Sequence, residues 1–232
     1  MSDLGRDLRY AVRMLAKSPG FAAVALGTLA LGIGANAAIF SVVDAVLLRP
    51  LPYGSPERLV AVYQTLPRQG VSSNGASYLN YLEFARARSF EGLGAVRMHD
   101  FTLTGQGEPA LVVGGTVTAN LIPLLRARPL LGRGLGPSDE GAAASPVAVL
   151  GEKLWRERFG ADPAAVGKTV RLDERPFTIA GVMPASFKTP PDVPPADLWT
   201  PLEQDPVFTD LRQNRGGHYL TLVGRLRGGV SR

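Results

Sequence analysis

The sequence PGFAAVALGTLALGIGANAAIFSVV, residues 19–43, decides the organisation of the chain. It carries no charged side chain, and Ala, Val, Leu, Ile and Phe make up most of it. As an α-helix, the uncharged run from Ser18 to Val43 would reach about 39 Å, which exceeds the ~30 Å hydrocarbon core of a bilayer. We therefore predict a transmembrane helix over residues 19–48.

Small residues recur at helical spacing along this predicted helix. Small side chains let a second helix backbone approach closely within lipid. The stripe therefore predicts that the helix packs against another membrane helix. The residues of this small-residue stripe are Ala23, Gly27, Ala30, Gly34 and Ala38.

Residues 1–18 predict an amphipathic leader on the cytoplasmic side of the membrane. Its charged residues are Arg6, Arg9, Arg13 and Lys17 against Asp3 and Asp7. Basic residues that flank a span hold their end in the cytoplasm. We therefore expect a cytoplasmic N-terminus, a leader that lies along the inner membrane surface, and residues after about 48 in the periplasm.

A cleaved signal peptide is the alternative for the same segment. A basic start, an apolar stretch from Phe21 to Gly34 and the small-residue sequence Ala35-Asn36-Ala37 fit its pattern. However, apolar sequence resumes after Ala37 and would be exposed at a new N-terminus. The apolar part of a signal peptide also spans only about 7 to 15 residues. The uncleaved anchor is therefore favoured, and N-terminal sequencing separates the two.

Composition excludes several classes of protein. The 232 residues include no Cys, which removes disulfide frameworks, thiolate nucleophiles and zinc ribbons. The formal net charge is +5, but the 25 Lys and Arg residues are dispersed along the chain. A nucleic-acid interface needs basic residues gathered on one face, so we expect no nucleic-acid partner.

Residues 49–232 predict a water-exposed domain of α+β class. Pro50, Pro52 and Pro56 indicate a stiff, extended connection at its start. Strands and helices alternate without the regular rhythm of a doubly wound sheet. A loop rich in Gly, Ser and Pro over residues 132–146 suggests a boundary, so we expect a mixed α/β domain of two small lobes.

Local patterns predict the elements of this domain. Ser77 is expected to cap a helix. His99-Asp100 is expected to form a turn between two strands, and Asp173-Glu174-Arg175 to form the turn of a hairpin. The face of the capped helix is predicted to hold Tyr78, Tyr81, Leu82 and Ala85. Further helices are expected around 120–126 and 152–159, and strands at 58–64, 93–98, 101–104, 110–117, 147–150, 170–172, 177–182 and 219–226.

Three motifs are similar to known sites but lack the context that those sites need. Gly167-Lys168-Thr169 matches the end of a phosphate-binding loop, yet Asp162 stands at the first glycine position and a strand follows. Residues 32–37 have dinucleotide-fingerprint spacing but lie inside the apolar run. His99 and His218 each lack a metal-binding partner at helical spacing. We predict no catalytic residue, no cofactor, no cofactor-binding residue and no metal ligand.

One set of stretches lies in and around the apolar run: Leu8-Arg9-Tyr10, Lys17 to Phe21, Leu29 to Asn36, Ala38 to Asp44 and Leu47 to Tyr53. A second set lies further along the chain: Leu154-Trp155-Arg156, Phe159-Gly160, Gly167 to Val170 and Gly181 to Phe187. The first set resembles the start of MacB/FtsX-type ABC transporter permeases, most of all the duplicated orphan permease branch, and the second resembles the MacB-like periplasmic core domain. Where that family carries an aromatic residue and then Leu-Gly, this chain has Ile122 and Leu125-Arg126.

The resemblance implies the N-terminal part of a permease in the inner membrane. Its non-catalytic periplasmic domain would relay motion driven by a separate cytoplasmic ATPase subunit, for export or signalling. The implied partners are that ATPase and either further permease spans or a second permease copy. Two other classes stay open: a stand-alone, single-pass membrane-anchored periplasmic binding module, and an anchored hydrolase that would use His99 or His218.

Overall fold

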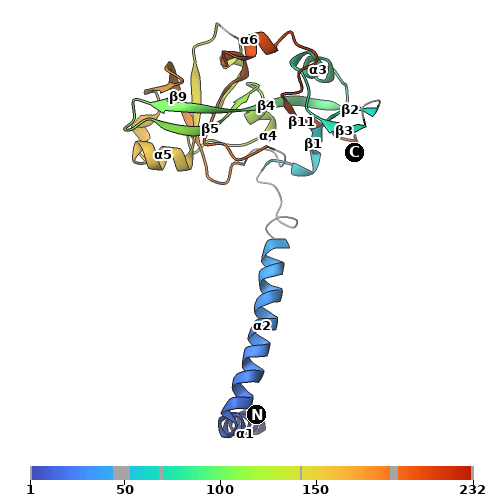
Figure 1. The fold of residues 1–232 in the computed structure, drawn as a ribbon, viewed down its shortest axis with the longest axis vertical. Helices are drawn as coiled ribbons and strands as arrows, with labels where there is room; N and C mark the ends of the chain where they lie inside the picture. The colour runs from blue at the N-terminus through green and yellow to red at the C-terminus, as the bar shows by residue number, and fades with distance from the viewer. Residues whose placement is uncertain (1, 44–52, 68–69, 142, 189–192, 231–232) are drawn as a thin grey trace. The chain divides into compact units, whose positions relative to one another are not determined.

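The computed structural model describes residues 2–43, 53–67, 70–141, 143–188 and 193–230. The chain divides into two compact units, residues 1–51 and 52–232, and Figure 1 shows the ribbon. Pro50, Pro52 and the predicted end of the span at residue 48 lie outside the described residues.

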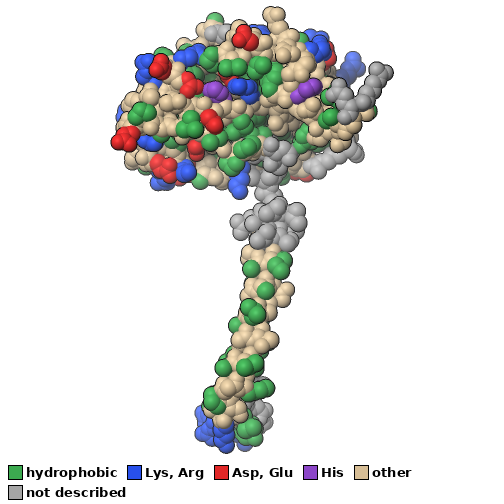
Figure 2. Space-filling view, viewed as in Figure 1, with side chains coloured by type: hydrophobic (Ala, Val, Ile, Leu, Met, Phe, Trp, Pro, Cys, Tyr) green, Lys and Arg blue, Asp and Glu red, His purple; other side chains and the backbone are tan. Residues whose placement is uncertain are grey.

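The described part of the first unit consists of two helices, α1 (Ser2–Lys17) and α2 (Pro19–Val43). Helix α2 is long and apolar enough to cross a membrane, with a mean hydropathy of 1.8. Figure 2 shows no charged side chain along α2, whereas Lys and Arg gather on α1. The side chains of Thr28, Asn36 and Ser41 each donate a hydrogen bond to the carbonyl four residues earlier. In a bilayer, back-bonding of this kind would spare polar groups from facing lipid unpaired.

The second unit is built on a mixed nine-stranded sheet. Its strand order is β1-β11-β4-β5-β10-β7-β9-β6, and β8 pairs with both β4 and β9. A separate two-stranded sheet joins β2 and β3. The strands are β1 (Leu59–Val62), β2 (Gln64–Leu66), β3 (Val71–Asn74), β4 (Phe90–Thr104), β5 (Ala110–Val117), β6 (Leu131–Gly132), β7 (Val147–Gly151), β8 (Thr169–Leu172), β9 (Arg175–Met183), β10 (Leu198–Pro201) and β11 (Thr221–Leu226).

Short helices and apolar clusters pack on this sheet. The helices are α3 (Tyr78–Phe84), α4 (Leu121–Leu125), α5 (Glu152–Phe159) and α6 (Phe208–Leu211). Trp199 and Phe187 belong to one apolar cluster, while Trp155 packs with β8 and β9 residues in another. A third cluster joins α3 to β4 and β11. The α+β class predicted from the sequence is therefore confirmed.

The two small lobes predicted for residues 49–232 are not separate in the structure. Contacts define residues 52–232 as one compact unit, and the main sheet runs through it. The loop over 132–146 begins inside that sheet, because Leu131–Gly132 pairs with β9. The Arg133 guanidinium also ties the loop down, donating to both carboxylate oxygens of Asp139 at 2.6 and 2.8 Å. The loop is thus anchored to the sheet and does not separate two domains.

The predicted turn at His99-Asp100 is also wrong. Both residues lie inside β4, where His99 pairs with Gly114 and Asp100 with Val113 of β5. The polar dipeptide suggested a turn, but β5 pairs with β4 continuously from Val96 to Leu103 and keeps it extended. Gly114 has no side chain and leaves room for the Phe101 ring, which a Cβ there would overlap. A long-range partner therefore overrides a local turn signal.

The predicted strand over 58–64 is divided between β1, which ends at Val62, and β2, which begins at Gln64 in the other sheet, and the prediction for α3 is confirmed in part. The Ser77 hydroxyl accepts a hydrogen bond from the Asn80 amide at 3.2 Å and caps α3, as expected. Tyr78 and Tyr81 are buried as predicted, but Leu82 is exposed, and so is Ala85. The buried face runs through Tyr78, Tyr81 and Phe84, because Phe84 packs against the third cluster, so Leu82 and Ala85 lie off this face.

The hairpin of β8 and β9 follows the sequence prediction closely. Leu172 pairs with Arg175 across a two-residue turn. Asp173 and Glu174 have φ of 47° and 65°, the left-handed region that two-residue hairpin turns require. Asp adopts positive φ more readily than most residues, whereas Glu has no such tendency.

Candidate functional site

The structure brings His99 close to a carboxylate that is distant in sequence. Its Nε2 atom lies 3.0 Å from Oδ2 of Asp173, and its ring packs edge-on against Phe101. The other oxygen of Asp173 accepts the Thr102 amide at 2.8 Å. Asp173 therefore holds the hairpin turn to β4. Among the described residues, no hydroxyl is hydrogen-bonded to His99, so the pair lacks the nucleophile that a hydrolytic triad needs.

His218 has a different environment. Its Nδ1 atom lies 3.2 Å from the Gly75 carbonyl, beside the bridge between Ala76 and Leu220. This contact holds the segment before α3 against the segment before β11. The described residues contain no group of three or more His, Asp and Glu placed to hold a metal ion.

In the segment similar to a phosphate-binding loop, the lysine is paired with a carboxylate of the same segment. Asp162 accepts the Ala164 amide at 2.8 Å and the Lys168 ammonium at 3.0 Å. The bond from Lys168 is the largest of the contacts that lower the pKa of this carboxyl. Thr169 then begins β8, as the sequence predicts. A strand provides no helix N-terminus for a phosphate, so this segment is a structural turn.

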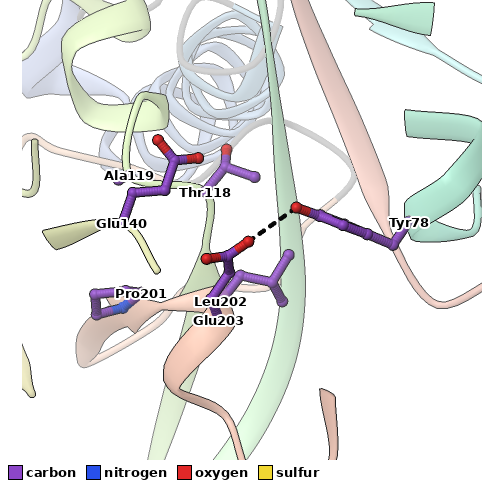
Figure 3. Close-up of a pocket in the computed structure, with 7 residues that line it drawn as sticks. All are labelled: Tyr78, Thr118, Ala119, Glu140, Pro201, Leu202 and Glu203. Atoms are coloured by element: carbon purple, nitrogen blue, oxygen red, sulfur yellow. Dashed lines mark hydrogen bonds between the residues drawn. The ribbon is translucent and has the colours of Figure 1, made fainter. Parts of the chain in front are cut away.

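A small hollow lies between α3 and the segment after β10 (Figure 3). The Tyr78 hydroxyl donates to Glu203 at 2.9 Å, and the Arg212 guanidinium lies 5.6 Å from the Tyr78 ring centre. Burial, followed by the bond to Glu203, raises the pKa of Tyr78. The space open to water is about 10 Å³. Known ligand pockets span roughly 300–1,000 Å³, so this hollow suits about one water molecule.

A wider hollow of about 310 Å³ has a basic rim. Two of its residues, Arg126 and Arg128, carry positive charge, and the buried Phe187 also lines it. Arg126 is already paired with Glu91 at 3.1 Å. Among the described residues, the lining includes no carboxylate or imidazole, the groups that acid–base catalysis uses most often.

The small-residue stripe lies entirely on α2. Nothing approaches within 4 Å of a Cβ built on Gly27 or Gly34, and all five stripe residues are exposed. The described residues therefore supply no neighbour for this face, and its packing role stays a prediction.

Comparisons with known proteins agree with this picture. The model of the family described as MacB-like periplasmic core domain matches residues 22–232. The periplasmic region of MacB from Actinobacillus actinomycetemcomitans is similar in fold, with a TM-score of 0.57 and 15% identity over 77% of this chain and 78% of that chain. The extracellular domain of the noncanonic ABC-type transporter YknZ from Gram-positive bacteria gives 0.51 and 11%, over 74% and 84%. No curated protein matches the sequence.

Fold and site together define a class: a sheet-rich α+β domain that follows one apolar, membrane-length helix. Within that class the chain belongs to the MacB-like periplasmic core domain family, because the family model covers nearly all of it. The resemblance to the MacB-like periplasmic core domain is therefore confirmed, whereas the duplicated orphan permease branch stays a prediction.

Proposed function

We propose that this chain is the N-terminal part of an ABC transporter permease whose periplasmic domain relays ATPase-driven motion for export or signalling. The observation that carries the proposal is the extent of the family match, which begins at residue 22 inside α2 and continues to residue 232. The match thus includes most of the candidate span together with the domain.

The proposed layout has three parts. Residues 1–18 are a cytoplasmic leader, 19–48 a transmembrane helix and 49–232 the periplasmic domain. The basic residues of α1 support the cytoplasmic placement of the N-terminus. Because the chain lacks Cys, single cysteines introduced at Arg6 and Glu157 report the sidedness of each part. An impermeant maleimide added to intact spheroplasts should label E157C but not R6C.

The domain is suited to transmitting motion as a rigid body. Its main sheet connects β1, the first strand, to all three apolar clusters through hydrogen-bonded neighbours. A displacement applied to the start of β1 is therefore shared by the whole sheet. His99 and Asp173 serve to hold a turn, which supports a role without catalysis.

The proposal includes two kinds of partner. One is a separate cytoplasmic ATPase, because this chain has no phosphate-binding loop of its own in the segment that comes nearest to one. The other is a set of further permease spans or a second permease copy, which would cover the exposed small-residue stripe of α2.

A tagged protein from native cells tests the proposal. An N-terminal tag is placed at the chromosomal locus, washed membranes are blotted, and the captured complex is sequenced by mass spectrometry. The permease predicts a tagged band well above 24.6 kDa together with an ATPase that carries a phosphate-binding loop. A band near that mass without an ATPase contradicts the proposal and favours the stand-alone anchored binding module.

A further inference from the structure

The chain enters its sheet-rich unit along an edge strand. Strand β1 pairs with β11 alone in the sheet order, and the pairing is antiparallel, from Leu59 opposite Arg225 to Val62 opposite Leu222. The start of β1 therefore lies beside the end of β11. A pull on the chain that is not held by the buried Tyr53 reaches the ladder at this first rung.

A pull at right angles to the strands is unfavourable for a β-ladder. Load on the first rung falls on one hydrogen-bonded pair at a time, so the bonds break in sequence instead of sharing the force. With four rungs, β1 would peel easily from β11 if backbone bonds were its whole attachment. Extra bonds at the first rung would oppose peeling most effectively.

Arg225 supplies such bonds from the β11 side. Its side chain is fully buried, with Nη1 donating to the Ser55 carbonyl at 3.0 Å and Nε to the Leu124 carbonyl at 2.7 Å. Ser55 precedes β1, and Leu124 lies in α4, which packs on β4. The guanidinium thus joins the entering segment to a helix outside the β1–β11 pair.

Arg225 is a costly residue at this position. Within the described residues it has no ion-pair partner, and its Nη2 atom has no hydrogen-bond partner. Burial lowers the pKa of Arg225, because a charge removed from water is destabilised. An apolar side chain would avoid this cost, so the bonds to the two carbonyls are the feature that explains the arginine.

Arg58 supplies bonds in the opposite direction. It lies just before β1, and its Nε atom donates to the Leu226 carbonyl at 2.9 Å, at the end of β11. Its Nη2 atom donates to the Glu91 carboxylate at 2.6 Å, near the start of β4. Glu91 also accepts Arg126 at 3.1 Å, so a second contact reaches the end of α4.

We propose that Arg58 and Arg225 form a two-arginine brace that keeps β1 from peeling away from β11 and fixes the entering chain to the sheet. Arg225 bonds from β11 to the segment before β1, and Arg58 bonds from that segment to the end of β11. That the entering chain is pulled during work rests on the proposed function. The brace itself is a property of the resting domain.

Hydrogen exchange of the full chain in lipid nanodiscs tests the brace, because peeling exposes the β1 amides that bond to β11. The variants are R58M and R225M, which keep an unbranched apolar stem and remove the donors. R227M is the matched control, because Arg227 also donates to a backbone carbonyl, that of Phe90 at 2.9 Å, but not to the entering segment.

Exchange of the β1 amides should quicken roughly tenfold in R58M and R225M, while R227M and the amides of β7 and β9 keep their wild-type rates. If the β1 amides of R58M exchange at the wild-type rate, the proposal of a brace is overturned. R58M also decides the matter if R225M fails to fold, since Arg58 is partly exposed. The experiment needs no ATPase, so its failure leaves the proposed relay untouched, and failure of the relay leaves the brace standing.

Discussion

Gly181 lies where β9 is flanked by both β6 and β7, and Gly181→Ala should disrupt this part of the sheet. A Cβ at this position would lie 2.5 Å from the Leu131 carbonyl oxygen, 2.8 Å from the Arg133 amide nitrogen and closer still to the Arg133 carbonyl. These are backbone atoms of paired segments, so no side-chain rotation relieves the overlap.

The cost follows from the bonds that must move. Shifting β6 away stretches the Leu130 amide bond to Val182 at 2.7 Å and the Arg133 amide bond to Ala180 at 2.9 Å. Two hydrogen bonds at ~1 kcal/mol each and ~1–3 kcal/mol for the forced shift give a loss of about 3 to 5 kcal/mol. For a domain of this size, that lowers the Tm by roughly 10 °C.

Thermal unfolding of the full chain in detergent micelles measures this change through fluorescence of the two buried Trp residues. Gly136→Ala is the matched control, because nothing lies within 4 Å of its Cβ and its backbone is extended. The control should unfold at or slightly above the wild-type temperature. A Gly181→Ala protein that unfolds within about 2 °C of wild type would refute the packing argument.

Three further predictions concern a carboxylate, a turn and the membrane helix. Burial raises the pKa of Asp139, but the bonds from Arg133 and the Gly136 amide outweigh burial and lower this pKa below 3.8. The ionised carboxylate therefore stabilises the fold fully above pH 3.8, and this stabilisation is lost as the pH falls through the lowered pKa of the folded state. Asp139→Asn should cost about 1.5 to 3 kcal/mol at pH 7 and flatten the acid limb of a pH titration of Tm; an unchanged limb contradicts this. Glu174→Gly should raise the Tm by about 2 °C, because glycine adopts positive φ without strain, and a lower Tm in the same melt would count against the turn geometry. In membranes, leucine at both Gly27 and Gly34 should weaken cross-linking to other permease spans, whereas Gly32→Leu, on another face of α2, should not. Equal cross-linking of the double variant and the Gly32→Leu variant would contradict a packing role for the stripe.

Much of the fold was accessible from local sequence patterns. Helix α5 was predicted at its observed bounds, 152–159, because Gly160 follows it and ends it in the left-handed region. The β8–β9 hairpin and the Ser77 cap were also predicted. In each case the deciding residues lie within a few positions of one another, so the sequence displays the physical cause directly.

The features that were missed depend on partners distant in the chain. The continuity of β4 through His99 requires β5, and the position of β10 between β5 and β7 follows from no local pattern. Asp173 reaches His99 across 74 residues. Burial of Arg225 was hidden as well, since an arginine in a strand normally predicts a solvent-facing position. Only the folded sheet shows that it lies against Ser55.

The central claim, that the domain moves when an ATPase works, is tested most directly by energy transfer between the domain and the membrane. A donor dye is attached at Glu157→Cys, an exposed position on α5 in a chain without native cysteines, and acceptor dyes are placed on lipids of a nanodisc that holds the full permease and its ATPase. The account predicts a transfer efficiency that changes on addition of ATP and returns when hydrolysis ends, with no change when the ATPase lacks its phosphate-binding lysine. An efficiency that stays constant while ATP is being hydrolysed would contradict it.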